Sequence, residues 1–246
     1  MDTRYSPVHV KPSRRKRTLD KLKTCAPYVP CFICVVGIVQ TVLYVLDDTE
    51  LFNLLLYSPY QREQPWRYIS YMLLHKDFAH LALNLGLQTL LAVVLEAEQG
   101  WPRTAGVYLL GGLTGSLGTA VLEPDLSMVG SSAGVYALLM AQLPNILYNC
   151  DLLRYKWYRI VSVACLCAGD IAYDTLRQGG PVISWSAHVS GAAAGLLLGF
   201  TIFVSHNDCS TFSKSLLRYA SFVIFMILFV FAILYIYTFK NRAVSL

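Results

Sequence analysis

Residues 129–136 read Val-Gly-Ser-Ser-Ala-Gly-Val-Tyr, and this short stretch fits two different templates. Gly130 and Gly134 are four residues apart, which is the spacing of small residues where membrane helices pack closely. With Ser132 between them they also form Gly-x-Ser-x-Gly, the frame that surrounds many nucleophilic serines. Taken alone, the stretch leaves open whether it is a helix-packing seam or part of an active site.

The composition places the chain in a membrane. Of its 246 residues, 55% are hydrophobic and 14% are charged, whereas an ordinary soluble domain is about 25% charged. A soluble protein of this length could not bury so much apolar surface. The net charge of +5 does not indicate nucleic-acid binding, because the basic residues are concentrated in the first 23 positions. There they indicate membrane topology and contact with anionic lipid headgroups.

Apolar segments of the length that a membrane helix needs, roughly 20 residues, recur along the chain. The seven segments are residues 29–46, 69–95, 104–122, 130–148, 157–175, 183–204 and 217–239. The fifth is the weakest, because Asp170 and Asp174 interrupt it. The sequence therefore predicts an all-α polytopic membrane protein, a bundle of seven transmembrane helices.

The same pattern predicts the organisation of the chain. We expect a basic cytosolic tail at 1–28, a six-helix core at 29–204, and a connector with a seventh helix at 205–246. Within the core, residues 47–68 are rich in Leu and aromatic side chains and suit the lumenal membrane interface, with an unstructured lumenal loop as the alternative. Basic residues before a first span stay in the cytosol, so the N-terminus should be cytosolic. Because seven spans are an odd number, the C-terminus should then be lumenal or extracellular.

Polar side chains fall at one depth on three of the predicted spans. The second, fourth and sixth spans all begin on the lumenal side in this orientation. The second carries His80 and Asn84, which are four residues apart and so share a helix face. The fourth carries Ser132 and the sixth carries His188. With a rise of about 1.5 Å per residue, both lie within a turn or two of the lumenal boundary.

This set of side chains favours nucleophilic catalysis. A serine hydroxyl becomes reactive when an imidazole takes its proton, and Asn and His side chains can donate to a developing oxyanion. Gly191 follows His188 by one turn and would let the two helices approach closely enough for His188 to reach Ser132. Plainer alternatives exist, since a membrane serine can bond within its own helix and a polar pair can simply hold helices together.

Five motifs make the chain resemble a known family. They are Pro-Trp-Arg-Tyr-Ile-Ser-Tyr-Met-Leu-Leu-His at 65–75, His-x-x-x-Asn at 80–84, Leu-Glu-Ala-Glu-Gln-Gly at 95–100, Gly-Ser-Ser-Ala-Gly-Val-Tyr-Ala-Leu at 130–138 and Ala-His-Val-Ser-Gly-Ala-Ala-Ala-Gly at 187–195. In these motifs the chain is similar to the rhomboids, which are intramembrane serine proteases. A further span after the histidine helix resembles the secretase-type animal rhomboids, with six core helices plus one.

The resemblance implies roles for single residues. Ser132 would be the nucleophile and His188 its base, in a dyad without an aspartate. His80 and Asn84 would help to form the oxyanion hole, and Tyr136 falls where the family stacks a tyrosine on the histidine.

Three further positions bear on the resemblance. Trp66 and Arg67 fall on the family's lumenal-loop motif, which implies a structural role for both. Ala133 departs from the pattern, because many members have glycine directly after the serine, and its methyl group would narrow the site slightly.

The resemblance also implies a function. The protein would be a serine endopeptidase of the secretory pathway that cuts single-span membrane proteins within or near the lumenal end of their transmembrane helix, such as EGF-type growth-factor precursors. Its partners would be these substrates and membrane lipid, without nucleic acid. No cofactor or metal is expected, since neither zinc-binding cysteine spacing nor an EF-hand loop occurs. The alternative is a non-catalytic rhomboid-like protein that binds membrane clients and controls their trafficking, and a transporter is a weaker third option.

Overall fold

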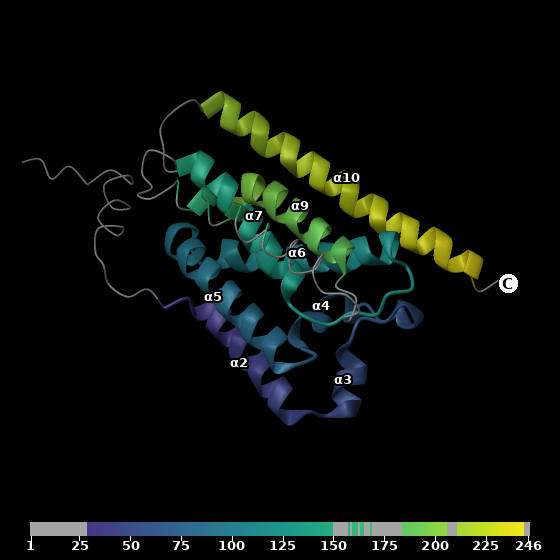
Figure 1. The fold of residues 1–246 in the computed structure, drawn as a ribbon. Coiled ribbons are helices and arrows are strands. Elements are labelled where there is room, and N and C mark those ends of the chain that lie inside the picture. The colour runs from purple at the N-terminus through teal and green to yellow at the C-terminus, as the bar shows by residue number, and fades with distance from the viewer. Residues whose placement is uncertain are drawn as a thin grey trace, which may run out of the picture.

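A computed structural model describes residues 29–149, a few positions between 157 and 168, 184–205 and 211–243 (Figure 1). These residues form helices and no strand, which confirms the predicted all-α fold of a polytopic membrane protein. The elements are α2 (Cys31–Leu46), α3 (Thr49–Leu55), η1 (Pro59–Gln61), α4 (Arg67–Ser70), η2 (Tyr71–Leu73), α5 (Phe78–Gln99), α6 (Trp101–Leu122), α7 (Ser132–Asn149), α9 (Trp185–Ile202) and α10 (Thr211–Ala243).

Most of the predicted spans appear as helices. Within the described part of the chain, four helices are long and apolar enough to cross a membrane, namely α5, α6, α9 and most of α10. α2 is apolar but shorter, and α7 is mostly buried among its neighbours, so few of its side chains need to suit lipid. The predicted fifth span, 157–175, lies largely outside the described residues. In Figure 1, α2 and α10 run in the same direction across the view.

The second predicted span begins later than its apolar pattern indicated. α5 starts at Phe78 rather than near residue 69, because residues 67–73 form the short helices α4 and η2. Asp77 fixes this start, since its side chain accepts a hydrogen bond of 2.8 Å from the His80 N–H. A carboxylate at this position satisfies one of the donors that a helix leaves free in its first turn.

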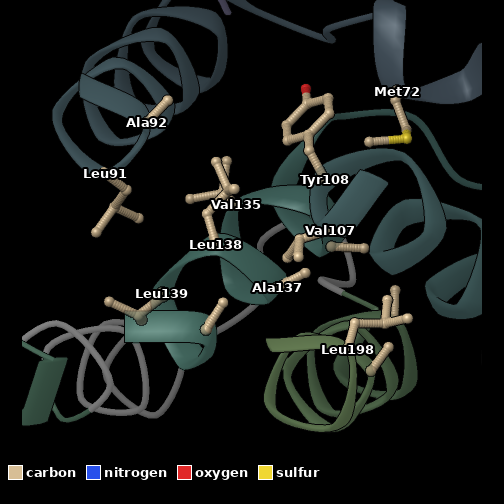
Figure 2. Packing of buried hydrophobic residues seen from close by; sticks show 14 of the residues in the cluster. Met72, Leu91, Ala92, Val107, Tyr108, Val135, Ala137, Leu138, Leu139 and Leu198 are labelled. Carbon is tan, nitrogen blue, oxygen red and sulfur yellow. The ribbon is translucent and has the colours of Figure 1, made fainter. Parts of the chain in front are cut away.

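The centre of the bundle consists of α6, α7 and α9, with α10 along the outside of α9 and with α2 and α5 on the opposite side (Figure 1). Small residues bring the central helices together. A β-carbon at Gly118 of α6 would run into the Ser190 side chain of α9, and one at Gly195 of α9 would run into the Ala137 backbone of α7. Around these seams, Met72, Tyr108 and Leu138 fill the core (Figure 2).

The loop between α2 and α5 is folded around one buried arginine. Arg67 donates to the backbone oxygens of Asn53 and Leu56 at 2.6 Å and 2.8 Å, and to the Gln64 side chain at 2.7 Å. Trp66 adds a bond of 3.1 Å from its indole N–H to the Leu54 oxygen. Trp66 and Arg67 thus connect residues 53–64 to the start of α4, and the loop is ordered rather than unstructured.

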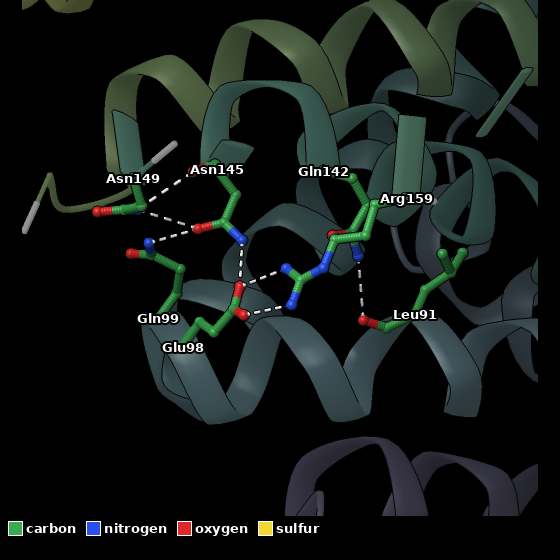
Figure 3. A network of polar contacts seen from close by, with 7 residues as sticks. All are labelled: Leu91, Glu98, Gln99, Gln142, Asn145, Asn149 and Arg159. Carbon is green, nitrogen blue, oxygen red and sulfur yellow. Dashed lines mark hydrogen bonds and ion pairs between the residues drawn. The ribbon is translucent and has the colours of Figure 1, made fainter. Parts of the chain in front are cut away.

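At the opposite end of α5, a polar network joins three elements (Figure 3). Glu98 pairs with Arg159 at 2.6 Å and accepts a bond from the Asn145 amide at 2.5 Å. Gln99 in turn donates to the Asn145 oxygen at 2.8 Å and to the Val204 carbonyl beyond α9 at 3.2 Å. Because buried charges and amides need partners, the network fixes how the ends of α5, α7 and α9 meet.

A second polar cluster lies deep between α2, α5 and α6. Gln40 donates to the Tyr108 hydroxyl at 3.2 Å and to the Met72 oxygen at 3.0 Å. Gln88 donates to the Gln40 oxygen at 2.8 Å, and its own oxygen accepts from Tyr108 at 3.1 Å. The three side chains are almost wholly buried and satisfy one another, so they determine the rotation and the depth of α2.

Candidate active site

Ser132 and His188, from helices that are far apart in sequence, meet at the start of α7. The Ser132 Oγ lies 2.9 Å from the His188 Nε2, within hydrogen-bond distance. A serine nucleophile and its general base need this contact. Ser132 is the first residue of α7 and is half-buried, whereas His188 is buried in the first turn of α9. The structure therefore brings together Ser132 and His188, which the sequence analysis placed at the same depth in the membrane.

Tyr136 supports the histidine from one side. It lies one turn after Ser132 on α7, and its ring stacks on the His188 imidazole with centroids 4.4 Å apart and planes at 20°. A stacked ring restricts rotation of the imidazole, so the hydrogen bond to Ser132 keeps its geometry.

Close contact between α7 and α9 makes this geometry possible. Gly191, one turn after His188, faces the backbone carbonyl of Ala133, where a side chain would have no room. The Ala133 methyl points the other way, toward Gly115 of α6, and is fully buried. The expected narrowing of the site by Ala133 is thus not seen, because this methyl group fills the α6–α7 seam.

His80 lies beside the serine segment. Its ring packs against Gly130, where an added β-carbon would be 2.6 Å from the His80 Cε1. Gly130 also has a positive φ of 116°, which favours glycine, and its N–H donates to the Tyr71 oxygen at 3.0 Å. Gly130, two residues before Ser132, therefore forms the turn into α7 and leaves room for the His80 ring.

Asn84 is buried one turn further along α5. Its amide donates to the His80 carbonyl at 2.9 Å, within its own helix. Among the described residues, it makes no hydrogen bond to Ser132 or His188. The proposed oxyanion pair is thus only partly assembled around Ser132, with His80 adjacent to the serine segment and Asn84 bonded to its helix.

A second serine–histidine contact lies next to the first. Ser131 is fully buried, and its Oγ is 3.3 Å from the Nε2 of His75, whose ring meets that of His80 edge to face at 5.1 Å. Burial lowers the pKa of His75, which precedes α5, to about 3, so its imidazole is a poor acceptor for a serine proton. The patterns in the sequence did not indicate this pair, because no spacing or motif links His75 with Ser131.

These features define a class: a polytopic helical membrane protein that holds a serine–histidine pair at the start of one helix. Comparison with known proteins agrees with this class. The Rhomboid domain family matches residues 62–205, more than half of the chain. The chain belongs to the rhomboid family.

Individual relatives agree with this assignment. Rhomboid-related protein 2 of Mus musculus is 31% identical over 244 residues, which covers 91% of this chain and 78% of the relative. Rhomboid-related protein 3 of Homo sapiens is 34% identical over 205 residues, and Rhomboid-related protein 1 of Caenorhabditis elegans is 28% identical over 188 residues. The chain spans about half the length of the latter two, with 51% and 52% covered.

Proposed function

We propose that this protein is a serine endopeptidase that hydrolyses peptide bonds of single-span membrane proteins. The observation that carries the proposal is the 2.9 Å hydrogen bond between the Ser132 Oγ and the His188 Nε2, at the end of a membrane helix. The stacked Tyr136 ring and the close approach at Gly191 support it, because both act on the placement of His188. Membership of the rhomboid family adds the expectation of proteolysis.

In the proposed reaction, the Ser132 Oγ attacks the carbonyl carbon of the scissile bond while His188 takes the hydroxyl proton. The resulting oxyanion is stabilised by N–H groups of the first turn of α7, which lack acceptors within the helix, and by His80. His188 then gives the proton to the departing amine nitrogen as the C–N bond breaks. A water molecule, deprotonated by His188, releases the acyl group and restores Ser132.

The substrate is expected to be a transmembrane helix that unwinds near the site. A helix backbone is fully hydrogen-bonded inside a membrane, so its peptide bonds are exposed only where small or helix-breaking residues loosen it. The resemblance extends the proposal to EGF-type growth-factor precursors and to cleavage near the lumenal side, with the N-terminus of the enzyme in the cytosol. It also supports the proposed division into a basic tail at 1–28, a core at 29–204 and a seventh helix within 205–246.

The test is co-expression with a panel of tagged single-span membrane proteins. Wild type should release soluble fragments from some of them, and Ser132→Ala and His188→Ala should release none. Ser131→Ala provides the matched control, since it removes a neighbouring hydroxyl that contacts another histidine. Fragment release that is equal for wild type and Ser132→Ala would refute proteolysis and favour the alternative of a non-catalytic client-binding protein.

A further inference from the structure

The carboxylate of Glu123 lies against the start of α9, although it belongs to a different helix. Glu123 caps the C-terminal end of α6, where its N–H donates to the Thr119 oxygen at 2.8 Å. Its Oε2 accepts from the Ser184 hydroxyl at 3.0 Å and from the Ser186 N–H at 3.2 Å, and also from the Ser186 hydroxyl. Three donors from two residues therefore converge on one carboxylate oxygen.

The position of this carboxylate matches the electrostatics of a helix start. The N–H groups of a first helical turn lack acceptors within the helix and carry the positive end of its dipole, which a negative charge stabilises. Ser184 is the N-cap of α9 and accepts from the Ala187 N–H at 3.2 Å. Thr119 adds its hydroxyl at 2.9 Å from that of Ser184. Because Ser184, Ser186 and Thr119 are all buried, little water is available to replace the carboxylate.

The same end of α9 carries the base of the proposed dyad. His188 follows Ser186 by two residues, and its N–H donates to the Ser184 oxygen at 3.2 Å. The first turn of α9 is thus held on one side by Glu123, while the next turn rests against Ala133 through Gly191. The separation of the Ser132 Oγ and the His188 Nε2 depends on the height and rotation of this turn.

We propose that Glu123 is a positioning residue, which holds the first turn of α9 so that His188 stays within hydrogen-bond reach of Ser132. This inference rests on the proposed proteolytic function. Glu123 does not touch the reacting atoms in this arrangement, and acts through the N-terminus of α9. A misplacement of a catalytic group by about 1 Å can cost an enzyme about 100-fold in turnover.

The experiment compares purified Glu123→Ala and Glu123→Gln with wild type in detergent, with a fluorogenic transmembrane peptide as substrate. Asp125→Asn is the matched control, because Asp125 is an exposed acidic residue in the same connection. We expect Glu123→Ala to lower kcat about 10- to 100-fold with KM nearly unchanged, since the substrate contacts remain. Glu123→Gln should recover part of this loss, because its amide oxygen can still accept from the Ser186 N–H. Asp125→Asn should match wild type.

Thermal unfolding of each variant separates positioning from stability alone. A lower unfolding temperature with an unchanged kcat per folded molecule would show that Glu123 only stabilises the fold, and would overturn the inference. A kcat equal to that of wild type in all three variants would also overturn the inference. If Glu123→Ala does not fold, the kcat of Glu123→Gln is compared with that of Asp125→Asn. A lower kcat for Glu123→Gln supports the inference, and equal values overturn it. If wild type is no faster than Ser132→Ala, the proposed function itself fails, and this inference fails with it.

Discussion

Gly191 of α9 faces the backbone of Ala133, the residue that follows the candidate nucleophile. A β-carbon at Gly191 would lie 3.0 Å from the carbonyl carbon of Ala133 and 3.1 Å from its Cα, and closer still to the carbonyl oxygen. Backbone atoms cannot move aside as a flexible side chain can, so the two helices would have to separate. The distance between Ser132 and His188 is thus coupled to the absence of a single methyl group.

Gly191→Ala should therefore reduce both stability and activity. Overpacking of this kind typically costs about 1–3 kcal/mol, and the separation of α7 from α9 would lengthen the Ser132–His188 contact. Thermal unfolding and peptide turnover in detergent measure the two effects. Gly86→Ala on α5 is the matched control, since a β-carbon there meets nothing within 4 Å. It should be neutral or stabilising by about 0.5–1 kcal/mol, and an equal loss in both variants would contradict the packing argument.

The two adjacent serines should differ in reactivity. Ser132→Ala should abolish cleavage, and Ser131→Ala should keep most of it, because Ser131 is buried and contacts His75 rather than His188. A serine-directed fluorophosphonate probe, followed by mass spectrometry of the labelled peptide, identifies the reactive residue. Labelling at Ser131 would reverse the assignment of the nucleophile.

His80 and Asn84 should contribute unequally. Asn84→Ala should leave slow but measurable cleavage at the same site, because its amide is bonded to the His80 carbonyl and other donors remain. His80→Ala should be worse, since it also removes the ring that packs against Gly130. Loss of one oxyanion donor costs about 100- to 1000-fold in turnover in other hydrolases, and less where neighbours compensate. If turnover by Asn84→Ala equals that of wild type, Asn84 only stabilises its helix.

The Glu98–Arg159 ion pair should contribute to stability through coupling with its neighbours. Both side chains are mostly buried, with 9% and 24% of their surface exposed. Glu98→Gln and Arg159→Met should each destabilise the protein, and the double variant should be less destabilised than the sum of the two. A double-mutant cycle of thermal unfolding should give a coupling of about 0.5–3 kcal/mol. If the losses of stability in the two single variants simply add in the double variant, the ion pair contributes little to the stability of the protein.

The proposed Ser132–His188 dyad could be predicted, because each residue occurs in a local motif. The predicted order of the spans then placed both residues at the same depth in the membrane. Ser132 lies at the start of an apolar segment next to paired glycines, and His188 lies one turn before Gly191. In the structure the two side chains lie within hydrogen-bond distance, and their catalytic roles stay a proposal. The start of α5 was harder to predict, because the apolar run from Ile69 to Leu74 resembles the beginning of a long helix and hides two short ones.

Contacts between distant segments that carry no recognised motif could not be predicted from the sequence. Glu123 reaches Ser184 and Ser186 only because the end of α6 packs beside the start of α9, about 60 residues further along the chain. The contact of His75 with Ser131 likewise depends on the turn before α5. Neither pair has a sequence spacing that identifies it.

The buried contacts of Gln40 have a consequence for biosynthesis. Its partners Met72, Gln88 and Tyr108 all come later in the chain, so α2 leaves the ribosome with a polar side chain that no finished neighbour can satisfy. In lipid an unpaired amide is costly, so α2 is less stable as an isolated helix than after it has met these partners. α2 therefore reaches its final position only after α5 and α6 have been inserted.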